Sequence, residues 1–183
     1  TVRIWALLFQ YLYFLYRQEG KAVAPYWTIV GYFNAIRELA GALALYDQDV
    51  LGRLEDLRER YGDPRPLREH MRRIELSSRI PSTALPVYLK LLEERSLDRY
   101  RPEEVPSAVF STSIFGVGVD IPRLSLMVVH GQPKTTSAYI QATGRIGRRY
   151  PGVVVTFYRA TRPRDLSHYE FFMGYHSMLD RFV

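Results

Sequence analysis

The chain has 183 residues, of which 47% are hydrophobic and 14% aromatic, so it can form one good hydrophobic core. A formal charge of +6 suits a polyanionic partner such as nucleic acid, although proteins that bind none also carry a charge this modest. The absence of cysteine excludes disulfides and thiolate zinc sites, and the four histidines lack any metal-binding spacing, so we expect no metal site.

The first predicted element is a strongly apolar stretch from Ile4 to Leu15. It is interrupted by Gln10, flanked by arginines and well short of the roughly 20 residues that a membrane span requires. We expect a buried helix within an N-terminal helical extension, residues 1–25, and no contact with a membrane. The chain begins at Thr1 and shows no signal-peptide cleavage pattern, which favours a piece of a longer protein.

Short apolar stretches farther along the chain are typical of strands buried on both faces of a parallel sheet. They are Trp27–Phe33, Ile74–Ser77, Ser107–Ser111, Leu124–His130 and Gly152–Tyr158. Amphipathic helices are expected between them at about residues 35–44, 82–95 and 136–145. This alternation predicts an α/β fold with right-handed crossovers around a mainly parallel sheet.

Two further segments have less regular patterns. The charged stretch from Gly52 to Arg73 contains prolines and glycine, and we expect a surface excursion with at most a short helix before Tyr61. The stretch from Asp165 to Val183 is aromatic and is expected to be helical. It either packs on the domain or leaves an apolar patch that docks a neighbouring domain.

Candidate binding residues follow the predicted strands, and ligands of parallel sheets bind at the carboxyl ends of the strands. Asn34 follows the first strand and is expected to cap the next helix, while Arg79 follows the second strand and Thr112 the third. Arg79 is a candidate for gripping a nucleic-acid backbone. The alternative for Arg79 is a surface ion pair with Glu75 or Glu69.

The most informative stretch runs from Gln141 to Arg148 and places two guanidiniums, those of Arg145 and Arg148, one helical turn apart. A guanidinium is planar, always charged and matched to phosphate oxygens, so this pair can stabilise charge on a transferring phosphoryl group. Gly144 and Gly147 leave room beside the arginines for another backbone or a nucleotide. The alternative is a solvated basic helix end that interacts with the helix dipole.

A second informative stretch, Ser111 to Pro122, takes a strand end into a glycine-bearing loop. The hydroxyl and backbone amides near Thr112 can hold a nucleic-acid phosphate, and Asp120 can accept hydrogen bonds from a ribose hydroxyl. The alternative is a tight turn in which Asp120 caps its own loop.

Together these stretches resemble superfamily 2 helicases. Residues 141–148 resemble motif six, and residues 111–122 resemble motif five at the right short distance ahead of it. The corner at Arg79 resembles motif four-a, and the strand before Asn34 resembles motif four. In that family the arginines of motif six reach across a cleft to an ATP bound mainly by another domain.

The resemblance implies the second RecA-like domain of a helicase, a three-layer α/β sandwich over residues 26–160, followed by a C-terminal aromatic helical extension at residues 161–183. The implied site comprises catalytic Arg145 and Arg148, ATP contacts from Gly118, Asp120, Gln141 and Gly144, and nucleic-acid contacts from Asn34, Arg79 and Thr112. The implied partners are nucleic acid, expected to be DNA, and the first RecA-like domain of the same polypeptide.

The implied cofactors are ATP and Mg, bound mainly by that first domain. This sequence lacks the Gly-rich loop ending in Lys-Ser/Thr that cradles phosphates and the Asp-Glu pair that holds magnesium. We therefore expect the first domain to lie upstream in the intact protein. The chain alone is expected to be inactive as an ATPase.

A closer resemblance is carried by Val30–Leu39, Phe115–Arg123 and Asp165–Glu170, which look like large bacterial helicases that include the helicase subunit of the DISARM anti-phage system. It implies a cytoplasmic defence role and other defence-system subunits as partners. Two other functions stay open: a nucleic-acid or protein-interaction module that does not hydrolyse ATP, and a hydrolase with its own site. For the hydrolase, the sequence singles out no Ser/His/Asp or paired-carboxylate arrangement.

Overall fold

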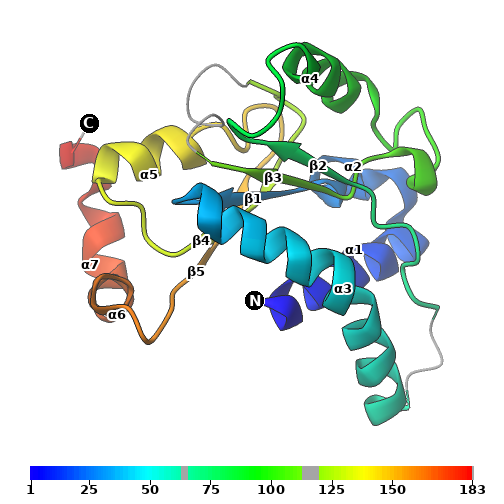
Figure 1. Ribbon diagram of the computed structural model, residues 1–183, viewed down its shortest axis with the longest axis horizontal. Coiled ribbons are helices and arrows are strands. Elements are labelled where there is room, and N and C mark those ends of the chain that lie inside the picture. The colour runs from blue at the N-terminus through cyan, green and yellow to red at the C-terminus, as the bar shows by residue number, and fades with distance from the viewer. Residues whose placement is uncertain (63–65, 113–119, 183) are drawn as a thin grey trace.

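The computed structural model describes residues 1–62, 66–112 and 120–182, and its centre is a five-stranded sheet (Figure 1). The strands are β1 (Ile29–Phe33), β2 (Arg73–Leu76), β3 (Ala108–Ser111), β4 (Leu126–His130) and β5 (Val153–Phe157). The helices are α1 (Val2–Glu19), α2 (Ala24–Trp27), α3 (Ile36–Tyr61), α4 (Ala84–Glu94), α5 (Thr136–Thr143), α6 (Pro163–Glu170) and α7 (Phe172–Ser177), with 3₁₀ turns η1 (Gly20–Val23), η2 (Pro102–Glu104) and η4 (Leu179–Phe182). Every predicted strand is present close to its predicted bounds.

The sheet is parallel throughout the described pairings, with strand order β2-β3-β1-β4-β5. In the register of the central strand, Ile29 lies opposite Ala108 on one side and Leu126 on the other. Because all strands run the same way, their carboxyl ends share one edge, which we call the carboxyl edge. The predicted α/β class with a parallel sheet is confirmed.

Helices cover both faces of the sheet and give three layers (Figure 1). Side chains alternate along β1: Ile29 and Phe33 pack with α1 and α3, whereas Val30 and Tyr32 pack with α4 and α5. Every residue of β1 is buried, which agrees with a strand covered on both faces.

Helix α1 is the buried helix expected near the N-terminus. It places Trp5 and Phe9 in the core, with Trp5 directly over the sheet at Gly31. A Cβ at Gly31 would lie 2.8 Å from the Trp5 ring, so the absence of a side chain permits this close approach. None of the helices in the described residues combines the length and apolarity needed to cross a membrane.

Helix α3 is longer than predicted, because it continues through Gly52 to Tyr61. The helix that the sequence allowed before Tyr61 is therefore present, but as the continuation of α3 and not as a separate short helix. Val50 and Leu54 extend the buried stripe of α3 into the core that contains α1, and this packing outweighs the cost of a helical glycine. The helix ends at Gly62, whose N–H donates to carbonyls of the last turn.

Candidate functional site

The predicted site residues that the structure describes form two groups. Asn34, Arg79 and Thr112 follow β1, β2 and β3 at the carboxyl edge. Asp120 and Arg148 form the second group, near the start of β4. Asp120 precedes this strand, whereas Arg148 follows α5. The Gly147 N–H donates to the Leu124 carbonyl at 3.2 Å and so holds the segment of Arg148 beside β4. Gly118 lies outside the described residues.

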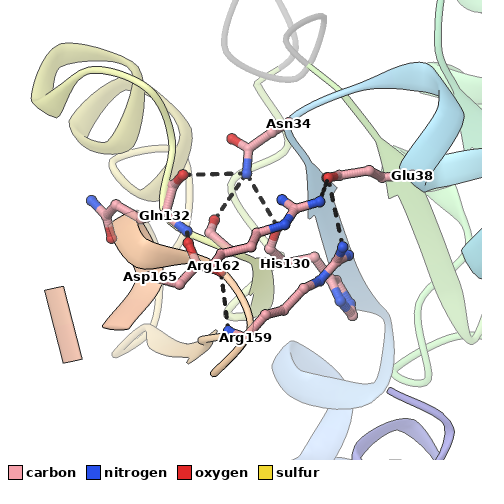
Figure 2. Close-up of polar contacts among 8 residues, drawn as sticks. Asn34, Glu38, His130, Gln132, Arg159, Arg162 and Asp165 are labelled. Carbon is pink, nitrogen blue, oxygen red and sulfur yellow. Dashed lines mark hydrogen bonds and ion pairs between the residues drawn. The ribbon is translucent and has the colours of Figure 1, made fainter. Parts of the chain in front are cut away.

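Asn34 joins the ends of two strands and does not cap α3, so the predicted cap was wrong. The residue at the N-cap of α3 is Ala35. The side-chain nitrogen of Asn34 donates to the carbonyls of His130 (3.1 Å), Gly131 (3.0 Å) and Gln132 (3.4 Å), as Figure 2 shows. These bonds fix the segment that leads from β4 toward α5.

Arg79 is exposed at the corner after β2, and its Nε lies 3.6 Å from a carboxylate oxygen of Glu75. The ion pair with Glu75, which was the alternative considered for Arg79, is therefore present. The backbone N–H of Arg79 donates to the Ser77 hydroxyl at 3.2 Å, and this bond stabilises the turn after β2. The Arg79 side chain is 47% exposed and its Nε lies beyond hydrogen-bond distance of Glu75, so the guanidinium is free to exchange partners.

Thr112 is buried at the end of β3, with 6% of its surface exposed. The preceding Ser111 donates its hydroxyl to the Leu76 carbonyl at 2.8 Å, so β2 and β3 stay joined up to this point. The position of Thr112 at the carboxyl edge is as predicted, and its role stays a prediction.

Helix α5 begins at a capping Thr135, whose hydroxyl accepts the Ala138 N–H at 3.2 Å, and ends at Thr143. The helix is close to its predicted bounds of about residues 136–145, but the prediction that Arg145 and Arg148 lie one helical turn apart was wrong. The chain turns at Gly147, which has a φ of 79°. A Cβ at this position would lie 2.7 Å from the backbone of Gly152, so Gly147 serves this turn within the domain.

Arg148 contacts Asp120 through one guanidinium nitrogen and one carboxylate oxygen. The two side chains are 44% and 40% exposed. Arg145 is half-buried, while Gln141 is exposed on α5. Asp120 thus pairs with an arginine of the other informative stretch, which unites those stretches in space.

A cavity of about 240 Å³ borders the same two segments. Its lining includes Ile121 and Pro122, which follow Asp120, and Arg149, which follows Arg148. The contact between Asp120 and Arg148 therefore sits beside open space on the protein surface.

A charged network at the carboxyl edge was not predicted from the sequence (Figure 2). Glu38 in the first turn of α3 accepts a hydrogen bond from Arg162, and Arg159 lies 3.6 Å from the same oxygen. Fully buried Asp165 accepts the backbone N–H of Gln132 at 2.9 Å and that of Arg159 at 3.1 Å. The network ties the C-terminal arm, residues 158–182, to the ends of β1 and β4.

His130 is fully buried at the end of β4 and stacks on Phe33 with ring centroids 4.3 Å apart. The indole N–H of Trp5 donates to Nε2 of His130 at 3.0 Å. Because Nε2 accepts this bond, the imidazole proton is assigned to Nδ1. Burial lowers the pKa of His130 to about 3, with a further lowering by the charge of Arg159. The imidazole is neutral at physiological pH and serves the packing of the core.

Residues 90–150 match the family described as helicase conserved C-terminal domain. Over its whole length the chain is 45% identical to the DISARM protein DrmA of Bacillus paralicheniformis, and it spans 16% of that protein. The resemblance to a helicase C-terminal domain is confirmed. Both informative stretches, residues 111–122 and 141–148, lie inside the matched region.

Solved helicase structures share the fold of this chain. S. cerevisiae Dbp5 bound to RNA and ADP BeF3 has a TM-score of 0.51 at 15% identity, over 81% of this chain and 32% of that one. The helicase MrfA bound to DNA has a TM-score of 0.50 at 20% identity, over 82% of this chain and 18% of that one. These likenesses concern the fold alone, and they confirm the predicted RecA-like sandwich.

Proposed function

We propose that the chain is the second motor domain of an ATP-dependent superfamily 2 DNA helicase or translocase that acts in anti-phage defence. The helicase match supports the motor, and the 45% identity to a DISARM protein supports the defence role. The proposed domain spans residues 26–160, between a helical N-terminal extension, residues 1–25, and an aromatic C-terminal extension, residues 161–183.

The observation that carries the proposal is the contact of Arg148 with Asp120. It shows that this guanidinium is accessible and already bound to an oxyanion at the surface. A phosphate presented by another domain offers the same kind of partner with more charge. Arg148, with neighbouring Arg145, is then the arginine finger that stabilises charge developing on the transferring phosphoryl group.

The remaining nucleotide contacts of the proposal are Asp120, Gln141, Gly144 and Gly118. Asp120, released from Arg148, accepts a hydrogen bond from the nucleotide ribose. When bound by the first RecA-like domain, ATP with Mg supplies the phosphoryl group. The chain alone is inactive in this proposal, because it contributes fingers to a site that the first domain builds.

Nucleic acid is proposed to cross the carboxyl edge. Arg79 exchanges Glu75 for a backbone phosphate, and Thr112 supports the same strand through its backbone or hydroxyl. The nitrogen of Asn34 is committed to three carbonyls, so its amide oxygen is the group that faces a partner. Related structures hold RNA in one case and DNA in the other, and we propose DNA from the likeness to the DISARM protein.

The test is ATP hydrolysis by the intact protein with and without single-stranded DNA. Arg148→Ala is expected to reduce the DNA-stimulated rate roughly 10³-fold with nucleotide binding retained, and Arg145→Ala to reduce it as well. Arg60→Ala, on the exposed end of α3, is the matched control and is expected to change nothing. An unchanged rate for Arg148→Ala contradicts the finger assignment. A wild type that DNA does not stimulate supports a non-hydrolysing binding module instead.

A further inference from the structure

A cavity of about 260 Å³ lies in front of the amino ends of β1, β2 and β3, opposite the carboxyl edge. Its walls come from the end of α1, from Trp27 just before β1, from residues 66–70 leading to β2, and from Pro102 and Glu103 of η2. None of the proposed motor residues lines it.

Two buried side chains that line this cavity are donors without acceptors. Arg68 is 2% exposed, and in the described part of the chain none of its three guanidinium nitrogens has a hydrogen-bond partner. Trp27 is 1% exposed, and its indole N–H also lacks a partner there. The guanidinium lies 3.7 Å from the centre of the Trp27 ring and 5.0 Å from that of Phe9.

The inward position of Arg68 is fixed by its backbone. Its N–H donates to the side-chain oxygen of Gln10 at 3.1 Å, and the nitrogen of Gln10 donates to the Pro66 carbonyl at 2.9 Å. Helix α1 thereby clamps both sides of residue 67 and holds the arginine against the aromatic rings. Stacking offsets part of the cost of burying the charge, but it satisfies no N–H.

We propose that this cavity binds a carboxylate, which accepts hydrogen bonds from the guanidinium of Arg68 and the indole N–H of Trp27. A carboxylate offers acceptors only, and its planar pair of oxygens matches the fork of a guanidinium. Burial lowers the pKa of Arg68 to about 9, so the group is still cationic at neutral pH. The unpaired buried charge and the unmet indole donor are then satisfied by one group.

The surroundings favour a single negative charge over a phosphate. Among the lining residues, the charges of Arg17 and Arg68 balance those of Glu69 and Glu103, so a singly charged anion leaves the cavity closer to neutral than a doubly charged phosphate does. The guanidinium nitrogens are shielded from solvent, so binding includes movement of a wall. Tyr16, which packs edge-on to Trp27 at 5.4 Å, is the wall residue that must shift.

Trp27 provides the readout, because Trp5 is the other tryptophan of the chain and Trp5→Phe leaves Trp27 alone. The probes are sodium acetate, a free carboxylate, and N-acetylglutamate methylamide, which presents the side chain of a protein segment. Each is expected to change Trp27 fluorescence in a saturable way. In the wild type, each is expected to raise the unfolding temperature by roughly 2–4 °C at about five times its dissociation constant. Sodium chloride at equal ionic strength and the blocked glutamine are expected to do neither.

Variants assign the response to Arg68. Arg68→Met is expected to abolish it and to raise the unfolding temperature without carboxylate, because an unpaired buried charge is removed. Arg68→Lys, which keeps the charge but lacks the fork, is expected to bind at least about tenfold more weakly. Arg60→Met, exposed on α3, is expected to respond as the wild type does. Glu103→Gln is expected to bind carboxylate more tightly, because a like charge is lost.

The two probes distinguish the source of the carboxylate. Tighter binding of acetate indicates a small free carboxylate, and tighter binding of the blocked glutamate indicates an acidic side chain; both support the site. The proposal is overturned if neither probe has an effect, or if phosphate binds more tightly than either. A loss of the response in Glu103→Gln also overturns it, because the response then depends on the Glu103 carboxylate and not on the donors of Arg68 and Trp27 alone.

Discussion

Arg148 donates to the carboxylate of Asp120, which lies 28 residues earlier in the chain. The contact joins the two stretches that the sequence marks for nucleotide chemistry, even though the structure ends the intervening helix before either arginine. Both side chains are about two-fifths exposed, so water competes for each of them. The pair is therefore easily exchanged for another partner.

The first prediction is that this ion pair stabilises the fold very little. In a double-mutant cycle with Asp120→Asn and Arg148→Gln, the coupling in the free energy of unfolding is expected to stay below about 1 kcal/mol. Urea unfolding of the four proteins measures it. A coupling above about 2 kcal/mol would show a structural pair and argue against a finger that changes partners.

The second prediction concerns Glu38, which holds Arg159 and Arg162 of the C-terminal arm. The Glu38 side chain is only 15% exposed, so Glu38→Gln leaves two arginines against a neutral group and is expected to cost about 2 kcal/mol. Proteolysis within the arm is expected to accelerate. The matched control is Asp47→Asn, which breaks an exposed pair with Arg73 and is expected to cost under about 1 kcal/mol. Equal losses in the two variants would contradict the anchoring role of Glu38.

The sheet was predictable from the sequence because its signals are local. The three central strands, β1, β3 and β4, are apolar stretches buried at every residue, which is the local pattern of a strand covered on both faces. The edge strands β2 and β5 are less buried, and each is short with turn residues nearby. The length of α3 was not predictable in this way. Charged residues and Gly52 obscure its second half, and the stripe through Val50 and Leu54 gains its meaning only from α1, which packs against it.

In the candidate site, too, local sequence patterns were predictable and contacts between distant residues were not. Motif spacing identified Asp120 and Arg148, but the turn at Gly147 depends on the backbone of Gly152 and carries no local helical or strand signal. The contact of Glu38 with Arg162 spans 124 residues of chain, and no spacing rule links such positions. Sequence patterns therefore supplied candidates for nucleotide chemistry and missed the network that holds the carboxyl edge.

The third prediction is a pH dependence of stability caused by His130. Its folded pKa is about 3 and an unfolded histidine has a pKa near about 6.5, so the unfolded state binds the proton more readily. The stability that neutral His130 contributes is fully present above about pH 6.5 and is lost as the pH falls toward 3. Between pH 7 and pH 5 the loss from this group is expected to be about 2 kcal/mol.

Urea unfolding of the wild type and of His130→Gln at both pH values isolates this contribution. Glutamine keeps an acceptor for the Trp5 indole N–H but does not titrate, so its decline between pH 7 and pH 5 is expected to be smaller by that amount. The contributions of the other ionisable groups are common to both proteins and cancel in the comparison. Equal declines would mean that His130 is protonated in the folded protein or that another group dominates.

The fourth prediction compares two glycines of opposite kind. Gly147 has a φ of 79° and faces the Gly152 backbone at 2.7 Å, so Gly147→Ala is expected to cost at least about 2 kcal/mol. Gly52 lies within α3 with nothing near its missing Cβ, so Gly52→Ala is expected to stabilise by about 1 kcal/mol. Thermal and urea unfolding measure both. In the intact protein, Gly147→Ala is also expected to lower DNA-stimulated ATP hydrolysis, because the turn orients Arg148. A Gly147→Ala variant that is as stable as the wild type would show that this turn is not required, and the placement of Arg148 would then need another cause.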